Sequence, residues 1–238
     1  MNQQFIRQIT IDWNKIDKYS YLRDIKAISG LDSLELTQPV TFFVGENGSG
    51  KSTLLEAVAV AYGFNPEGGT RNYNFSTYNS HSELHEAIRL SKGYRKAQDG
   101  YFLRAESFYN VATQEEAYAD ERHPSERYHE KSHGESFLAI AQKRLHPNGI
   151  YIFDEPEAAL SPQRQLTLLM EIYNCVREGS QFIIVTHSPI LLSIPSAEIL
   201  TFDDGPLHPC SYEETDSYQI TKMFIDNRKQ ILQRLIGE

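Results

Sequence analysis

The stretch FFVGENGSGKSTLLEAV, residues Phe42–Val58, decides the fold class. It contains the pattern G-x-x-x-x-G-K-[ST], completed by Gly45, Gly50, Lys51 and Ser52, between an apolar run typical of a buried strand and one typical of a helix. Such a loop turns backbone N–H groups toward a phosphate, and the following helix adds its positive N-terminal end. The stretch therefore predicts a site for a nucleoside triphosphate.

The residues of this loop have different expected roles. Lys51 is expected to neutralise the β- and γ-phosphate oxygens, and the Ser52 hydroxyl is expected to ligate Mg²⁺. The purpose of the nucleotide must come from the rest of the chain, because P-loops serve kinases, switches, motors and transporters. The full set expected to bind the nucleotide is Gly45, Glu46, Asn47, Gly48, Ser49, Gly50, Lys51, Ser52 and Thr53.

A second motif, GIYIFDEPEAALSP at residues 149–162, carries an apolar run that ends in two carboxylates. The carboxyl ends of parallel strands meet at one edge of a sheet, so Asp154 is expected to hold the magnesium shell opposite Ser52. Glu155 follows directly and can orient and deprotonate the attacking water. An Asp-Glu pair after a strand is a weak signal alone, but downstream of a P-loop it is a strong one.

Two further segments bring groups toward a nucleotide. FIIVTHSPILL, at 182–192, places His187 after another apolar strand, where its imidazole could contact the γ-phosphate. Taken alone, His187 is better explained as a surface histidine, but its order after the first two motifs favours the functional role.

EKSHGESFLAIAQKRL, at 130–145, places Ser132 and Gly134 at the start of an expected helix, which suits an anion. Since one P-loop already cradles a phosphate, this second cradle is best used on a nucleotide held by another copy.

The order of apolar runs predicts an α/β core with a mostly parallel sheet. Strands are expected at 40–44, 100–111, 150–153 and 182–185, and helices at 54–62, 135–145 and about 163–176. We expect a single domain over residues 1–238, with a helical subdomain inserted at roughly 75–145. No sustained heptads occur there, which excludes a coiled-coil arm. The apolar tail at 218–235 is expected to be a helix packed on the core or on a partner.

Composition limits the partners. The net charge of −9, from 32 acidic and 23 basic residues, gives no global attraction to DNA, RNA or anionic membranes, so DNA binding is possible only through a local patch. Two widely separated cysteines suit a reducing compartment, and no apolar run approaches a membrane span, so we expect a cytoplasmic protein. His81 and His85 have the spacing of a helical metal pair, but no third ligand is visible, and a dedicated metal site is not expected.

The motifs, in their order, resemble those of ABC-type ATPases over roughly residues 35–205: Walker A at GENGSGKST, a signature at SHGES, Walker B at IYIFDEP, a D-loop at ALSP and a switch histidine in VTHS. The residues within and around these motifs are more similar to those of soluble AAA-family or RecF/SMC-like ATPases than to those of transporter cassettes. The resemblance implies a P-loop NTPase fold of ABC-ATPase type, with ATP and Mg²⁺ held between two subunits. It also implies that Asp154 supports the metal, Glu155 is the catalytic base and His187 senses the γ-phosphate, while Ser132 and Gly134 act on the ATP of the other subunit.

Three departures from the family pattern stand out. His133 replaces a signature glycine, Ser161 replaces the aspartate often found in the D-loop, and no Q-loop glutamine is obvious. Glu106 is the substitute expected near the metal, and the loss of a neutral amide there could make hydrolysis slow. The candidates for stacking on adenine are Trp13, Tyr19, Tyr21 and Arg71, but each of them taken singly is better explained as a packing or surface residue.

These motifs favour an ATPase that dimerises around ATP to drive or gate an unknown effector protein. A second hypothesis is a binding module in which ATP holds the dimer closed without turnover. A third is the ATP-binding subunit of a membrane transporter. The intact Asp154-Glu155 pair favours the enzyme over the non-turnover module.

Overall fold

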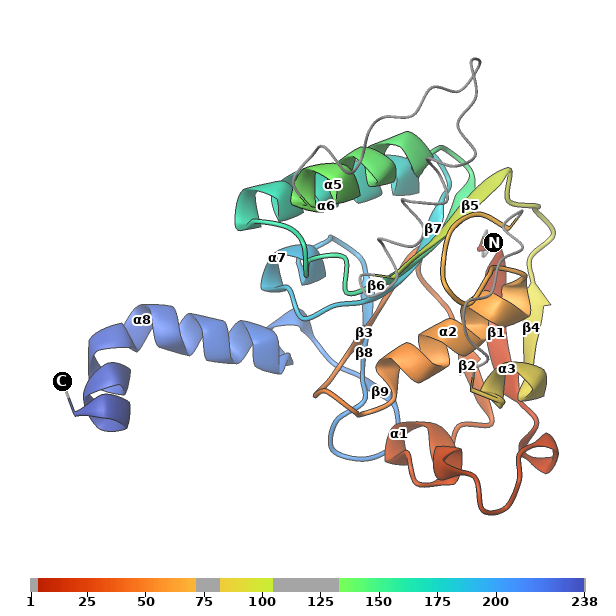
Figure 1. Ribbon diagram of the computed structural model, residues 1–238, viewed down its shortest axis with the longest axis horizontal. Helices are drawn as coiled ribbons and strands as arrows, with labels where there is room; N and C mark the ends of the chain where they lie inside the picture. Colours follow the sequence, from red (N-terminus) through yellow and green to blue (C-terminus); the bar gives the residue numbers. More distant parts are fainter. Residues whose placement is uncertain (1–3, 72–81, 105–132, 238) are drawn as a thin grey trace.

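The computed structural model describes residues 4–71, 82–104 and 133–237, and it contains two sheets with helices packed on them (Figure 1). Within these residues the larger sheet has the strand order β5-β6-β7-β3-β8-β9. Its strands run parallel from β5 to β8, and β9 pairs antiparallel with β8. The predicted α/β fold with a mostly parallel sheet is confirmed. In sheet order the strands are Asp99–Arg104, Gly149–Asp154, Gln181–Val185, Val40–Val44, Glu198–Thr201 and His208–Pro209.

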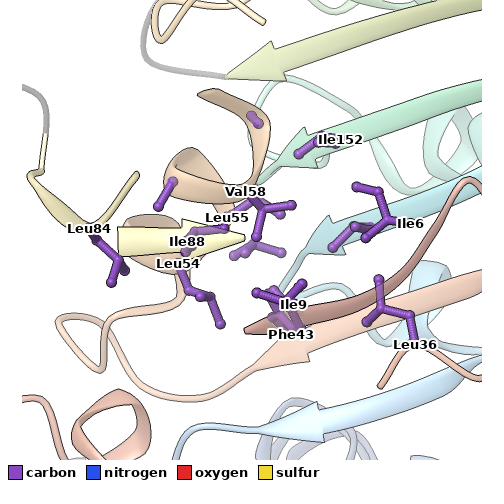
Figure 2. Packing of buried hydrophobic residues seen from close by; sticks show 14 of the residues in the cluster. Ile6, Ile9, Leu36, Phe43, Leu54, Leu55, Val58, Leu84, Ile88 and Ile152 are labelled. Atoms are coloured by element: carbon purple, nitrogen blue, oxygen red, sulfur yellow. The ribbon is translucent and has the colours of Figure 1, made fainter. Parts of the chain in front are cut away.

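The central strands are apolar throughout because helices cover both faces of this sheet. Strands β3, β6 and β7 are buried along their whole length, as is typical of parallel strands. Helix α2 (Lys51–Tyr62) lies on one face, where Leu54, Leu55 and Val58 share an apolar cluster with Phe43 (Figure 2). Helices α5 (His133–Arg144) and α6 (Pro162–Arg177) cover the other face and form a second cluster with the alternate strand residues.

A smaller antiparallel sheet packs on the same side as α2. It consists of β2 (Ser33–Glu35), β1 (Ile6–Ile11) and β4 (Ile88–Lys92), in that order. The buried side chain of Gln181, at the start of β7, ties this sheet to the larger one. Its Oε1 accepts a hydrogen bond from the Ile6 N–H at 2.9 Å, and its Nε2 donates one to the Ile6 carbonyl at 2.9 Å. One side chain thus satisfies both backbone groups of a residue that lies inside the core.

Most predicted helices and strands are present, with boundaries shifted by a few residues. Helix α2 begins at Lys51 rather than near residue 54, because the glycine loop leads directly into the first helical turn. Helix α6 begins at Pro162, where the Ser161 hydroxyl accepts a hydrogen bond from the Arg164 N–H at 3.4 Å and caps the helix. Strand β5 ends at Arg104, and the rest of the strand expected at 100–111 lies outside the described residues.

The range expected for the helical subdomain, 75–145, is described only in part. Residues 84–104 form the short helix α3 (Leu84–Ala87) and strands β4 and β5, and both strands pair within the two sheets. Strands β4 and β5 therefore belong to the two sheets, and Tyr101, Phe102 and Leu103 of β5 are buried in the core. Helix α5 is the described helical portion, and the subdomain as a whole stays a prediction.

Helix α8 (Asp216–Ile236) extends away from both sheets (Figure 1). None of its residues is buried, so the expected packing of this tail on the core is not observed. No helix in the described ranges is both long enough and apolar enough to cross a membrane. The remaining elements are α1 (Lys26–Ser29), α7 (Pro189–Leu192) and short 3-10 turns at Trp13–Lys15, Tyr21–Arg23 and Tyr212–Glu214.

The bridge from Gln181 to Ile6 predicts a large loss of stability on its removal. Gln181→Leu should lower the free energy of unfolding by about 2 to 4 kcal/mol, because two buried backbone groups lose their partners. Denaturant unfolding followed by circular dichroism measures this change, with the exposed Gln163→Leu as the matched control on α6. Equal stability of the two variants would contradict a structural role for this amide.

Candidate nucleotide site

The loop between β3 and α2 has a backbone conformation that suits glycine. Gly45, Gly48 and Gly50 have φ angles of 141°, 83° and 99°, which side-chain-bearing residues rarely adopt. A Cβ atom on Gly50 would also lie only 2.6 Å from the Ile25 side chain. The loop leads directly into Lys51, the first residue of α2, so the unpaired N–H groups of the first helical turn begin where the loop ends. This arrangement is typical of phosphate-binding loops.

The side chain of Lys51 is folded back over this loop. Its Nζ donates hydrogen bonds to the carbonyl oxygens of Gly45 and Glu46, both at 2.7 Å, and the residue is 4% exposed. Burial lowers the pKa of the Lys51 ammonium, and nearby carboxylates, led by Glu155 and then Asp203, oppose that shift. The cation therefore lies among acceptors that a phosphate oxygen can replace, since ammonium groups bind phosphates as compact point charges.

The ends of α2 and β6 meet through one hydrogen bond. The Ser52 hydroxyl donates to Asp154 Oδ1 at 2.9 Å, which brings together the two residues expected at the metal. Hydroxyl and carboxylate oxygens are the ligand type that magnesium prefers, so this pair fits a magnesium site. Asp154 Oδ2 also lies 3.7 Å from Arg104 Nε, and Arg104 in turn donates to Glu56 at 2.6 Å. The sequence reasoning missed Arg104, although it lies only two residues before Glu106, the residue chosen there as the Q-loop substitute.

Glu155 and His187 face each other across the same edge of the sheet. The Glu155 backbone has φ of 50°, in the left-handed region, and is held there by a hydrogen bond from its N–H to the Val185 carbonyl at 3.0 Å. Such conformations cluster at functional sites. His187 Nε2 lies 3.9 Å from Glu155 Oε1. Burial lowers the pKa of His187, the Lys51 ammonium lowers it further, and Glu155 raises it in opposition.

Two side chains that the sequence reasoning did not assign hold the loop that carries His187. Glu157 Oε1 accepts a hydrogen bond from the His187 backbone N–H at 2.5 Å, and burial raises the pKa of this carboxyl group. On α6, Gln165 accepts from the Ser188 hydroxyl at 2.6 Å and donates to the Leu160 carbonyl at 3.0 Å. The backbone near the expected D-loop is thus connected to the histidine loop. The only sign of this connection in the sequence was Glu157, the third acidic residue of DEPEAAL.

Asp203 is a further residue at the site that the sequence reasoning missed. It follows β8, and its Oδ1 accepts a hydrogen bond from the Glu46 N–H at 2.9 Å, which fixes the start of the P-loop. A cavity of about 750 Å³ lies beside this contact, lined among others by Gly45, His187 and Asp203 and, on the other side, by the first turn of α8. No local motif marks Asp203, because only the pairing of β8 with β3 brings it to the loop.

The structure brings together most of the predicted site residues, and two others lie outside the residues that it describes. Gly45 to Thr53, Asp154, Glu155 and His187 meet at the ends of β3, β6 and β7. Gly134 lies in the first turn of α5. Ser132 and Glu106 lie outside the described residues. The roles expected for Ser132, Gly134 and Glu106 stay predictions.

The adenine candidates have contacts of their own. The Trp13 indole donates to the Leu31 carbonyl at 3.2 Å and carries the Arg23 guanidinium 5.3 Å from its ring centre. The Arg71 guanidinium lies 5.8 Å from the ring centre of Tyr62. Tyr19 and Tyr21 are exposed. Of the histidine pair, His81 lies outside the described residues and His85 Nδ1 lies 2.8 Å from the Ser82 carbonyl oxygen.

The profile of the family described as AAA domain matches residues 21–168, which is more than half of the chain. The chain belongs to this family. The resemblance of this AAA domain protein to P-loop ATPases, which its motifs had indicated, is thereby confirmed. Binding of a nucleotide is general to such proteins.

The AAA domain protein is also similar to longer proteins of known designation. It is 30% identical over 229 residues to the arabinose import ATP-binding protein AraG of Pseudomonas savastanoi pv. phaseolicola (strain 1448A / Race 6), a match that covers 85% of this chain and 44% of that protein. The AraG protein of Pseudomonas syringae pv. syringae (strain B728a) is 30% identical over 203 residues, with 76% and 39% covered. The chain thus spans less than half the length of these relatives. Among solved structures, the SMC head domain from Thermotoga maritima matches with a TM-score of 0.47 and 13% identity, over 87% of this chain and 100% of that chain.

The contacts of Lys51 predict that nucleotide binding depends on its ammonium group. Lys51→Ala should weaken Mg-ATP binding by about a hundredfold or more, because several charge-assisted hydrogen bonds are lost together. Isothermal titration calorimetry measures the affinity, with the exposed Lys96→Ala as control. Undiminished affinity in Lys51→Ala would contradict the assignment of this loop to the phosphates.

The two charges near His187 predict opposite effects on its titration. In the nucleotide-free protein, His187 should titrate below its usual pKa of about 6.5. Lys51→Ala should raise this pKa because it removes a neighbouring cation, and Glu155→Gln should lower it because it removes the carboxylate that favours the imidazolium. Titration of the imidazole C–H resonances by NMR measures both shifts, with His187→Gln to assign the signal. Shifts of the same sign in the two variants would rule out this electrostatic arrangement.

Proposed function

We propose that this AAA domain protein hydrolyses ATP to ADP and phosphate, and that two copies close head to tail around the nucleotide to drive or gate an effector protein. The observation that carries the proposal is the 2.9 Å hydrogen bond between Ser52 and Asp154, with Glu155 and His187 beside it. A phosphate loop, a metal-binding pair and a base thus lie at one edge of the sheet. This is the set of groups that phosphoryl transfer to water requires.

The chain's own residues would bind and orient the phosphates. The loop from Gly45 to Thr53 offers backbone N–H groups, and Lys51 exchanges its two carbonyl acceptors for phosphate oxygens. Ser52 and Asp154 would hold Mg²⁺, with Glu106 as an additional candidate. When bound, the metal neutralises charge on the β- and γ-phosphates.

Glu155 would act as the general base. Its carboxylate takes a proton from water as the water oxygen attacks the γ-phosphorus and the bond from that phosphorus to ADP breaks. His187, kept neutral by burial and by Lys51, would contact the γ-phosphate through the nitrogen that now faces Glu155. Glu157 and Gln165 would position this histidine, because Glu157 accepts from the backbone N–H of His187 and Gln165 accepts from the hydroxyl of the next residue, Ser188.

The head-to-tail dimer rests on a second anion site in the same chain. Ser132 directly precedes α5 in the sequence and Gly134 lies in its first turn, and a helix N-terminus favours an anion. In the proposed closed dimer these residues act on the γ-phosphate of the other copy. Hydrolysis then removes the group that both copies share, and the dimer loosens.

This assembly predicts how a base-deficient variant behaves. Glu155→Gln should lower the hydrolysis rate about 10² to 10⁴-fold while it keeps ATP binding, because only the proton acceptor is lost. It should therefore accumulate the closed dimer with Mg-ATP, and light scattering coupled to gel filtration measures the mass.

Adding Ser132→Arg should prevent that ATP-dependent association, because a bulky cation then occupies the contact between the copies. The exposed substitution Lys96→Ala in the same background serves as the control. An ATP-dependent association that is indifferent to Ser132→Arg would reject the head-to-tail arrangement and leave a P-loop ATPase with another assembly.

A second candidate function follows from the names of the two similar proteins, which are ATP-binding proteins for arabinose import. In that case the chain would supply ATP turnover to a membrane-embedded partner. Incubation with membranes of its own source separates the two candidates. Retention on those membranes that is lost on adding Mg-ATP or detergent would favour the transporter subunit, and absence from the membrane fraction would favour a soluble effector.

A further inference from the structure

Helix α8 presents an apolar surface that its own chain does not cover. None of the residues of this 21-residue helix is buried, and large apolar side chains on it are 41% to 75% exposed. Contiguous exposed apolar surface of this kind commonly marks an interaction site. The exposed large residues are Ile220, Met223, Phe224, Ile225, Leu235 and Ile236.

The helix has two segments with opposite charge. Asn227 has φ of −125° and ψ of 24°, which are not helical values and divide α8 into residues 216–226 and 228–236. The first segment follows Glu213 and Glu214 and carries two carboxylates, and its single lysine forms an ion pair with Asp226 at 3.5 Å. The second segment carries Arg228, Lys229 and Arg234 and no acidic residue. The arm, residues 213–236, is therefore acidic where it leaves the body and basic toward its end.

We propose that this arm pairs with the same arm of a second copy of the chain. In an antiparallel pair related by a two-fold axis, the acidic start of each arm lies against the basic end of the other. Residues three, four, seven or eight positions apart share a helix face, so Ile220, Met223 and Phe224 form an apolar row on the first segment, and Ile231 and Leu235 form one on the second. A surface that complements itself in this way is what a two-fold interface requires.

The arm is anchored to the body only near its start, among the residues described. The Tyr212 hydroxyl donates to the Pro189 carbonyl at 3.0 Å, and its ring centre lies 4.7 Å from that of Tyr218. Thr215 is buried at the same junction. Pro189 begins α7, two residues after His187. Pairing of the arms would therefore hold two nucleotide sites in one particle whether or not a nucleotide is bound, which goes beyond the ATP-dependent closure proposed above.

An anionic membrane is the main competing occupant, because the second segment is a basic amphipathic helix. The first segment argues against it, since Glu213, Glu214 and Asp216 would be repelled by the same surface that attracts Arg228 and Arg234. The acidic body, with a net charge of −9 for the whole chain, adds to that repulsion. A second copy offers a basic segment to the acidic one and an acidic segment to the basic one. It is therefore the occupant that the charges favour.

Sedimentation equilibrium of the full chain without nucleotide tests the proposal. The chain should be dimeric, and Phe224→Glu should raise the dissociation constant about thirtyfold or more, because a central apolar contact is lost and a carboxylate is introduced. Phe224 is 41% exposed, so the substitution leaves the folded core intact. Met170→Glu, at a residue 53% exposed on α6, is the matched control and should leave the dimer unchanged.

Charge exchange adds a second test that misfolding cannot imitate. Arg228→Glu with Arg234→Glu should weaken the dimer, and Glu213→Lys with Asp216→Lys in the same chain should restore it in part. Ser132→Arg should leave the nucleotide-free dimer intact. Because the arm alone would give a dimeric mass, the ATP-dependent gain in mass is measured in a Phe224→Glu background, and the two contacts are thereby tested separately. A nucleotide-free chain that is monomeric, or a dimer that Phe224→Glu does not weaken, overturns the proposal. A monomer that sediments with vesicles of anionic phospholipid overturns it in favour of the membrane.

Discussion

The parallel register of β3, β7 and β6 sets the position of nearly every group at the candidate site. Phe43 pairs with Val185, and Val185 pairs with Asp154, so the three strands end at the same level. The P-loop, the histidine loop and the Asp154-Glu155 pair then leave the sheet at one edge. A slip of one residue in either pairing would turn the side chains of the shifted strand to the opposite face, and it would separate Ser52 from Asp154. The apolar clusters on both faces keep this register because every apolar residue of these three strands belongs to one or the other.

Burial at that edge makes its few charges depend on one another. Lys51 is almost completely enclosed, and its ammonium lies within the field of several carboxylates, of which Glu155 has the largest effect. The same ammonium acts with burial to keep His187 neutral. Electrostatic interactions are stronger where water is excluded, so a change at one of these three residues alters the other two. The site is best regarded as one coupled set of charges.

The histidine loop and helix α8 extend this dependence toward the surface. Glu157 and Gln165 hold the histidine loop from the side of the expected D-loop, and α7 leads from the same loop to the junction that carries α8. In the proposed dimer, contacts between copies at the D-loop or along α8 would reach the His187 loop through these side-chain hydrogen bonds. Such connections would be a physical route for coupling between copies.

The sequence by itself determined the class of the fold and indicated most residues of the candidate site. The P-loop spacing, the apolar run ending in Asp154 and Glu155, and the strand before His187 are local patterns, and each depends on residues that are neighbours in the chain. Local patterns also predicted the central strands and helices within a few residues, because periodicity reflects which faces are buried. Strand β4 was not predicted, since it is a short run that becomes a strand only by pairing with the distant β1. Tertiary structure alone decided that Asp203, Arg104 and Gln165 lie at the site, that Gln181 joins the two sheets and that α8 leaves the core. Those contacts join residues far apart in sequence. The spacing of residues along the chain does not show which distant residues become neighbours when the chain folds.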